Sequence, residues 1–198
     1  MQNKYSSLQL DALKEVSNIG VGNAATSLSS LIGHKIDITV PSVNVVELNT
    51  IISESGEKLV AGIVVRVLGD IPGNILIIFE EKVAKKIIEM LTGKVEDEPS
   101  EMGYSVLCEI GNILSASYMN AITKFTGLEA IPSVPAASYD MMGAILATTF
   151  MEAGQFDEYI LDIETVFLKN DTNDFGAHFY YIPVPGSIEK ILNKIGIN

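Results

Sequence analysis

The sequence predicts a single α/β (α+β) domain with pseudo-two-fold symmetry, in which two long helices pack on an antiparallel sheet. Three observations support this prediction. A polar pattern on a helical segment recurs at a constant offset of 94 residues, from Glu15 to Glu109. Each copy is followed by runs rich in β-branched residues. The connector at 94–100 is too short to resemble a flexible linker, so residues 1–198 should form one domain of two halves, about 1–97 and 98–198.

The first half is expected to begin with a long amphipathic helix over residues 6 to about 32. Ser6 or Ser7 is a suitable N-cap, and Gly33 marks the end of the helix. Residues 35–47 alternate β-branched and other side chains, which predicts a strand interrupted by Pro41. The remaining elements predicted in this half are strands at 58–68 and 74–79 and a helix at 81–92.

The second half should repeat this order. A long helix is predicted over 101–125, ending before Gly127. The other predicted elements are strands at 128–138, 142–151, 159–168 and 177–182, a turn at 170–176 and a closing helix at 187–194.

Composition restricts the expected partners and compartment. The chain has 198 residues, 47% of them hydrophobic, which is enough for one substantial core. A formal net charge of −12 would repel nucleic acid and anionic membranes, so a protein or small-molecule partner is expected. A single cysteine, Cys108, fits a reducing compartment, and no apolar run reaches the roughly 18 residues of a membrane span. These features predict a cytoplasmic protein without membrane insertion.

Both long helices place polar residues along one narrow line. At about 100° per residue, Asp11, Glu15, Asn18 and Gly22 share one side of the first helix. Glu15 and Asn18 are three residues apart, so their Cβ atoms lie roughly 5–6 Å from each other. The corresponding residues of the second helix are Ser105, Glu109, Asn112 and Ala116, and a proline, Pro41 or Pro135, follows each asparagine by 23 residues.

An ordinary solvated helix face could explain one such pair, but it would accept any charged residue, whereas the repeat preserves a carboxylate, an amide and a proline.

The other motifs in the sequence are weaker evidence for a functional site. The glycines at 20 and 22 match a dinucleotide fingerprint without the strand-to-helix turn that it needs. The loop at 171–176 lacks the ligands of a calcium loop, and His34 and His178 have no neighbouring cysteines for a zinc site, so no metal site is predicted. Cys108 is expected to be an inert buried thiol.

A carboxylate and an amide can complete an active site that a substrate already mostly contains. An amide does not exchange protons near neutral pH, but it can hold a water molecule in line with a phosphorus atom. The carboxylate can pair with a lysine of the partner and fix its position.

The doubled pattern resembles the signature of the CheC/CheX/FliY family of chemotaxis phosphatases. That signature is Asp or Ser, three residues, Glu, two residues, Asn, 22 residues and Pro. It is met twice here, by Asp11, Glu15, Asn18 and Pro41, and by Ser105, Glu109, Asn112 and Pro135. The similarity covers essentially the whole chain, and its two copies favour the CheC branch over CheX, which keeps one site per chain and dimerises.

This resemblance implies that the chain dephosphorylates the response regulator CheY. Asn18 and Asn112 would position the attacking water, and Glu15 and Glu109 would pair with the regulator's active-site lysine. The chain would need no cofactor of its own, since Mg²⁺ comes with the phosphorylated regulator. The resemblance also implies binding of the deamidase CheD, and we expect a monomer. The alternative is a non-catalytic adaptor that binds CheD, CheY or both.

Unequal use of the two sites is also expected. The second helix carries Ala116 where the first has Gly22, and Tyr118 where the first has Ala24. Gly22 and Ala116 are small, so each would let the backbone of another protein approach its Glu/Asn pair.

Overall fold

The computed structural model describes residues 5–33, 35–47, 50–51, 57–153, 159–169 and 175–197. Its helices are α1 (Ser7–Ile32), α3 (Glu81–Thr92), α4 (Glu101–Thr126), α5 (Met142–Ala153) and α6 (Ser187–Lys194). Its strands are β1 (Ile36–Glu47), β2 (Leu59–Gly69), β3 (Gly73–Glu80), β4 (Ala130–Pro132), β5 (Ala136–Met141), β6 (Tyr159–Lys169) and β7 (Phe175–Pro183).

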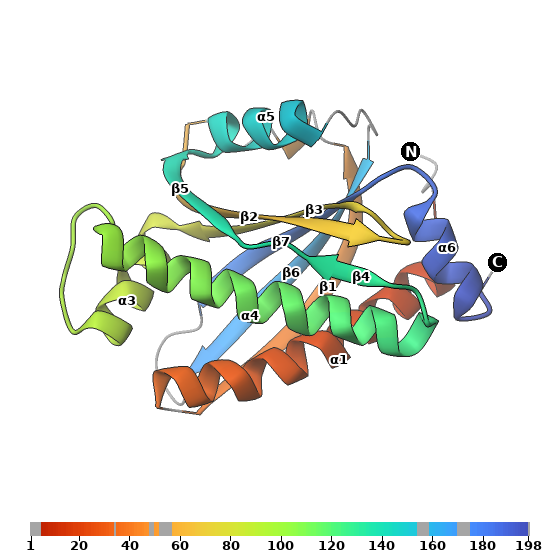
Figure 1. The fold of residues 1–198 in the computed structure, drawn as a ribbon, viewed down its shortest axis with the longest axis horizontal. Coiled ribbons are helices and arrows are strands. Elements are labelled where there is room, and N and C mark those ends of the chain that lie inside the picture. The colour runs from red at the N-terminus through yellow and green to blue at the C-terminus, as the bar shows by residue number, and fades with distance from the viewer. Residues whose placement is uncertain are drawn as a thin grey trace.

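The strands form one antiparallel sheet with helices on both faces (Figure 1). The described strands number seven, in the order β1-β6-β7-β3-β2-β4, and β5 pairs with β2 next to β4. At the centre of the sheet, β3 pairs antiparallel with β7. Each of these two strands leads into a helix, α3 or α6, in the order predicted from the sequence. The α+β fold class predicted from the sequence is confirmed.

Local signals set the ends of both long helices. The Ser6 side chain accepts a hydrogen bond from the Gln9 N–H, and the Gln9 side chain accepts one from the Ser6 N–H, which makes a capping box. Ser100 caps α4 in a similar way by accepting from the Gly103 N–H. Gly33 and Gly127 end the helices with φ of 73° and 70°, a left-handed conformation that glycine adopts without strain. The predicted bounds of both helices are therefore confirmed.

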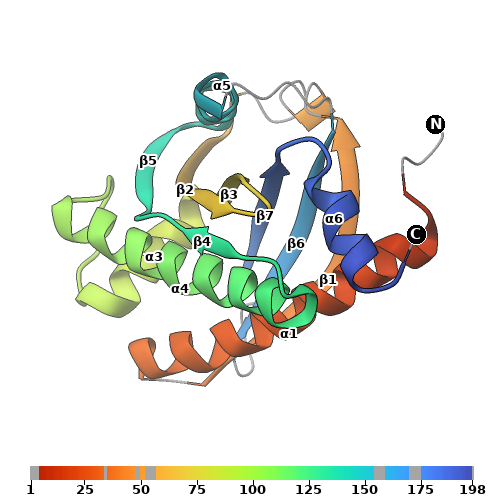
Figure 2. The same cartoon turned by 45° about the vertical axis from the view of Figure 1, so that its right-hand side comes forward.

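Helices α1 and α4 lie side by side on one face of the sheet (Figures 1 and 2). A Cβ atom added at Gly20 would lie 2.9 Å from the Tyr118 Cα, so the helices approach closely at this point. The hydroxyl oxygens of Ser17 and Tyr118 are 3.4 Å apart in the same buried contact. The close neighbour of Gly20 is therefore α4.

Hydrophobic cores fill both faces of the sheet, which explains the continuous apolar runs in its strands. Successive side chains of β3 point alternately to the two faces. Ile75, Ile77 and Phe79 belong to the core beneath α1 and α4, while Leu76 and Ile78 belong to the core beneath α5. All but Ile78 are completely buried, and Ile78 is nearly so.

The strand predicted at 142–151 is wrong, because this segment forms helix α5. Up to residue 149, where burial is described, its buried side chains are Met142, Ile145, Leu146 and Thr149, the i, i+3, i+4, i+7 spacing of a helix with one face on the sheet. A short apolar run does not by itself distinguish a buried strand from a buried helix. Here the helical spacing of the larger side chains decides the structure.

The single strand predicted at 128–138 is also wrong, since β4 and β5 are separate strands with residues 133–135 between them. Pro132 is the last residue of β4 and Pro135 lies in the break, and proline has no N–H to donate to a strand ladder. Ser133 keeps the segment attached to β2, because its N–H donates to the Arg66 carbonyl at 2.7 Å and its Oγ accepts from the Arg66 N–H at 3.0 Å. Of the turn predicted at 170–176, residues 170–174 lie outside the described part of the chain, and β7 begins at Phe175.

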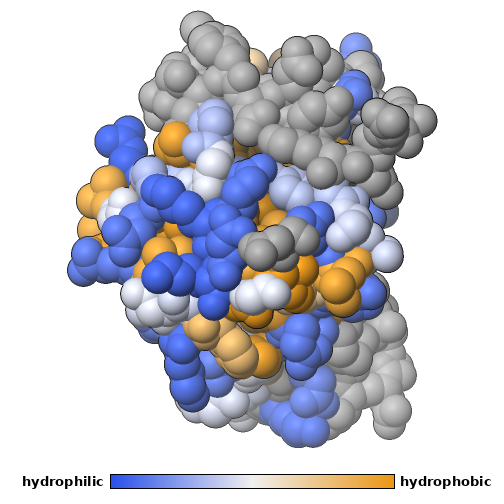
Figure 3. All heavy atoms as spheres, turned by 90° about the vertical axis from the view of Figure 1, so that its right-hand side faces the viewer, coloured by the Kyte–Doolittle hydropathy of each residue, from blue (hydrophilic) through white to orange (hydrophobic). Residues whose placement is uncertain are grey.

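The end of the molecule that carries α6 presents hydrophilic side chains with separate hydrophobic patches among them (Figure 3). Leu68 and Ile131, which are paired across β2 and β4, are each about half exposed, at 51% and 50%. Among the helices that the structure describes, none has the length and apolar character needed to cross a membrane.

Candidate active site

The first Glu/Asn pair lies on the solvent-facing side of α1. We call Asp11, Glu15, Asn18 and Gly22 the first stripe. Asp11, Glu15 and Gly22 are exposed and Asn18 is half-buried. The opposite side of the helix is buried, through Leu13, Val16, Ser17 and Gly20. The helical phase inferred from the sequence is therefore the phase that the structure has.

The second stripe consists of Ser105, Glu109, Asn112 and Ala116 on α4. The first three are exposed and Ala116 is half-buried, so this stripe also faces solvent. Its helix is held by its other side, where Leu107, Ile110, Gly111 and Leu114 are buried. A Cβ atom added at Gly111 would lie 2.5 Å from the Ile63 Cγ2 on β2, so Gly111 lets α4 pack closely on the sheet next to Asn112.

The functional groups of both stripes remain available for an external partner. Among the described residues, no hydrogen bond or ion pair involves the side chains of Glu15, Asn18, Glu109 or Asn112. Each amide keeps its two N–H donors and its carbonyl acceptor free to orient a bound molecule. Each carboxylate can accept a hydrogen bond from a cationic side chain.

Both prolines of the pattern lie at interruptions near the outer edges of the sheet. Around Pro41 the register between β1 and β6 shifts, between Thr39 and Ser42, which is the expected place for a proline in a strand. Pro135 lies in the break between β4 and β5, and its carbonyl oxygen accepts from the Cys108 thiol at 3.7 Å. Since Cys108 precedes Glu109, this contact places Pro135 beside the second stripe.

The sequence reasoning missed the segment at residues 133–135 as a neighbour of the second stripe. Val134 is 89% exposed, so an apolar side chain projects into solvent beside Pro135. The signal that could have revealed this segment is the pair of prolines at 132 and 135, which breaks the strand. Cys108 itself is half-buried rather than buried as expected, and burial raises the pKa of its thiol.

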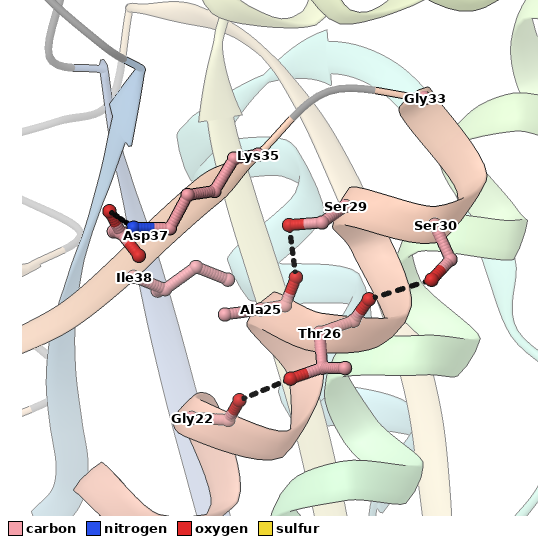
Figure 4. A pocket seen from close by; sticks show the side chains of 9 residues that line it. All are labelled: Gly22, Ala25, Thr26, Ser29, Ser30, Gly33, Lys35, Asp37 and Ile38. Atoms are coloured by element: carbon pink, nitrogen blue, oxygen red, sulfur yellow. Dashed lines mark hydrogen bonds and ion pairs between the residues drawn. The ribbon is translucent and has the colours of Figure 1, made fainter.

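A groove extends the first stripe toward the end of α1 (Figure 4). It has a volume of about 700 Å³ and lies between α1 and the start of β1. The hydroxyls of Thr26, Ser29 and Ser30 donate to carbonyl oxygens of the preceding helical turn. Lys35 and Asp37 form an ion pair of 3.0 Å on the opposite wall. The groove is thus a shallow polar surface continuous with Gly22, where an added Cβ would meet nothing within 4 Å.

In the ranges that the structure describes, no three side chains of His, Cys, Asp or Glu are arranged to hold a metal ion.

Comparison with known proteins gives two matching families and several relatives. Residues 8–45 match the CheC-like family, and residues 60–141 match the family described as chemotaxis phosphatase CheX. The CheY-P phosphatase CheC of Bacillus subtilis (strain 168) is 33% identical over 196 residues, which cover 95% of this chain and 94% of that protein. The flagellar motor switch phosphatase FliY of the same organism is 36% identical over 88 residues, 44% of this chain and 23% of that protein.

Solved structures share the fold. FliY of Thermotoga maritima superposes with a TM-score of 0.82 at 19% identity, covering 97% of this chain and 98% of that chain. The FliM middle domain from H. pylori gives a TM-score of 0.67 at 17% identity, covering 96% and 99%. The resemblance inferred from the doubled pattern is confirmed by the Bacillus relative, which matches over nearly the full length of both chains. The chain belongs to the CheC/CheX/FliY family.

Proposed function

We propose that this chain hydrolyses the aspartyl phosphate of a phosphorylated response regulator of the CheY type. The observation that carries the proposal is the pair of exposed Glu/Asn stripes on α1 and α4, whose functional groups have no partner among the described residues. The 33% identity to a CheY-P phosphatase supports the choice of substrate.

The proposed chemistry requires little from the chain itself. The regulator contributes the phosphoaspartate, a lysine and the Mg²⁺ ion bound beside them. The amide of Asn18 or Asn112 holds a water molecule in line with the phosphorus, as the glutamine of small GTPases does. The water oxygen bonds to phosphorus while the P–O bond to the aspartate breaks. The products are the free aspartate carboxylate and inorganic phosphate, which keeps the oxygen and protons of the water.

The carboxylates of Glu15 and Glu109 are proposed to bind the regulator's lysine. A charge-assisted hydrogen bond would align the phosphoaspartate with the amide three residues along the helix. The remaining positions of the pattern leave room for the regulator to approach the two stripes. Gly22 is open, the groove beyond it extends the contact surface on α1, and Val134 and Pro135 border the second stripe on α4.

The test is the decay of phosphorylated CheY after a small amount of the chain is added to an excess of regulator. We expect the chain to accelerate the decay through many turnovers. If the chain binds the regulator and leaves its decay rate unchanged, the phosphatase proposal fails. The stripes would then be docking surfaces of an adaptor that binds CheD, the regulator or both.

Glu15→Gln combined with Glu109→Gln should weaken regulator binding more than the chemical step. Loss of the charge-assisted bond should raise the regulator concentration that gives half-maximal rate by about five- to thirtyfold. The maximal rate should fall by a smaller factor, because both amides remain. Steady-state phosphate release measures the two effects. Glu89→Gln removes the same charge from an exposed position on α3, and it should change neither value. If the Glu15→Gln/Glu109→Gln variant and Glu89→Gln give the same half-maximal concentration and the same maximal rate, the two glutamates do not pair with the regulator's lysine.

A further inference from the structure

A second cavity lies on the opposite face of the sheet from α1 and α4. Its volume is about 590 Å³, within the roughly 300–1,000 Å³ of small-molecule sites. Val60, Ile78 and Met142 supply apolar walls and belong to the core beneath α5. Polar side chains from β6 and β7 complete the lining, so the cavity combines an apolar body with a polar end. Neither stripe contributes to this cavity.

Tyr180 contributes a hydroxyl group to the cavity lining. Its side chain is only 3% exposed, yet its hydroxyl has no hydrogen-bond partner among the residues that the structure describes. Burial and the nearby negative charge of Asp162 raise the pKa of Tyr180, so the phenol is protonated at neutral pH. Its oxygen is a free acceptor for a ligand in the cavity.

The cavity is negatively charged around this hydroxyl. Asp162 Oδ1 is 3.3 Å from His178 Nδ1, and the His178 ring stacks on Tyr180 with centroids 5.6 Å apart. Glu164 also lines the cavity and accepts a hydrogen bond from the Ser42 hydroxyl at 2.8 Å. Glu80 adds a third carboxylate, while Lys58 is the opposing cation of the described lining. Asp162 raises the pKa of His178, so the pair takes a proton more readily than free histidine.

We propose that this cavity binds a small organic cation, a primary amine carried on an apolar body. The ammonium group would donate to the Asp162 carboxylate and to the Tyr180 hydroxyl oxygen, and the aromatic face of Tyr180 would add cation–π attraction. The apolar body would pack on Met142 and Val60. This arrangement gives the Tyr180 hydroxyl a partner and offsets the surplus of carboxylates. The proposal is independent of the phosphatase chemistry on the other face of the sheet.

Phenethylamine is a suitable probe, with phenylethanol and phenylpropionate as neutral and anionic counterparts of similar shape. Binding can be followed through the Met142 methyl signal in NMR spectra of the full chain with labelled methionines. We expect the amine to shift this signal and to bind at least about tenfold more tightly than either counterpart. Equal binding of the three compounds, or no shift up to about 10 mM amine, overturns the proposal. Water would then be the sufficient partner of Tyr180.

Two variants test the polar contacts. Tyr180→Phe keeps the ring and removes only the hydroxyl, so amine affinity should fall about three- to tenfold while the fold is retained. Asp162→Asn should reduce affinity about tenfold or more. Asp97→Asn removes the same charge from an exposed connector residue and serves as the matched control. If Asp162→Asn and Asp97→Asn weaken binding equally, the cavity does not hold the ammonium group, and the proposal fails.

Discussion

The variant carrying both Asn18→Ala and Asn112→Ala is expected to return phosphorylated regulator to its own decay rate. Alanine has no group that can orient the attacking water, and removal of one positioned polar group at a reacting centre costs about 10²–10³ in rate. Each single variant should keep the activity of the other site, so only the double variant should lose all acceleration. The measurement is the decay of phosphorylated CheY with the variant present at saturating concentration.

The control for this result is Asn120→Ala. Asn120 is exposed on the same side of α4, two turns beyond Asn112, so the change removes an equivalent amide at a position without a neighbouring glutamate. It should leave the decay rate unchanged. The asparagines of both stripes have no partners among the described residues, so thermal unfolding of the double variant should match that of the parent chain. If the double variant still accelerates decay at saturation, the amides do not position the water.

The sequence was sufficient to predict the stripes because their geometry depends on local signals. A serine cap and a stop glycine define each long helix, and the helical period then decides which residues share a side. Burial of Leu13, Val16 and Gly20 fixes the rotation of α1 with Glu15 outward. The same logic applies to α4. Neither result requires knowledge of how the strands pair.

The incorrect predictions depend on tertiary context. Hydrophobic residues occur throughout segment 142–151, so the sequence alone fits either a buried strand or a buried helix. The sheet surface beneath the segment is what makes one helical face of it the buried face. The cavity on that face needs Asp162, His178 and Tyr180 together. The pairing of β6 with β7 brings them into register, and a strand pairing between distant segments is not encoded in either segment alone. The same holds for the contact between Cys108 and Pro135.

Gly111→Val is expected to lower the stability of the chain substantially. The Cβ position at Gly111 is 2.5 Å from the Ile63 Cγ2, and Ile63 is completely buried on β2. The side chain of an introduced valine would therefore collide with Ile63, and neither has free space to move into. Overpacking of a tight core contact costs about 1–3 kcal/mol and sometimes more. Valine adds two methyl groups beyond Cβ, so we expect about 3 kcal/mol. For a chain of this size that corresponds to a decrease in Tm of about 6–12 °C, measurable by circular dichroism.

Gly22→Val is the matched control, because it makes the same substitution in the middle of the other long helix. Nothing lies within 4 Å of the Cβ position at Gly22, so only helix propensity changes, by a few tenths of a kcal/mol in favour of valine. Its Tm should equal or slightly exceed that of the parent chain. Because Gly111 precedes Asn112, displacement of α4 from β2 should also reduce turnover at the second stripe and spare the first. If Gly111→Val and Gly22→Val have the same Tm, α4 does not pack closely on the sheet at Gly111.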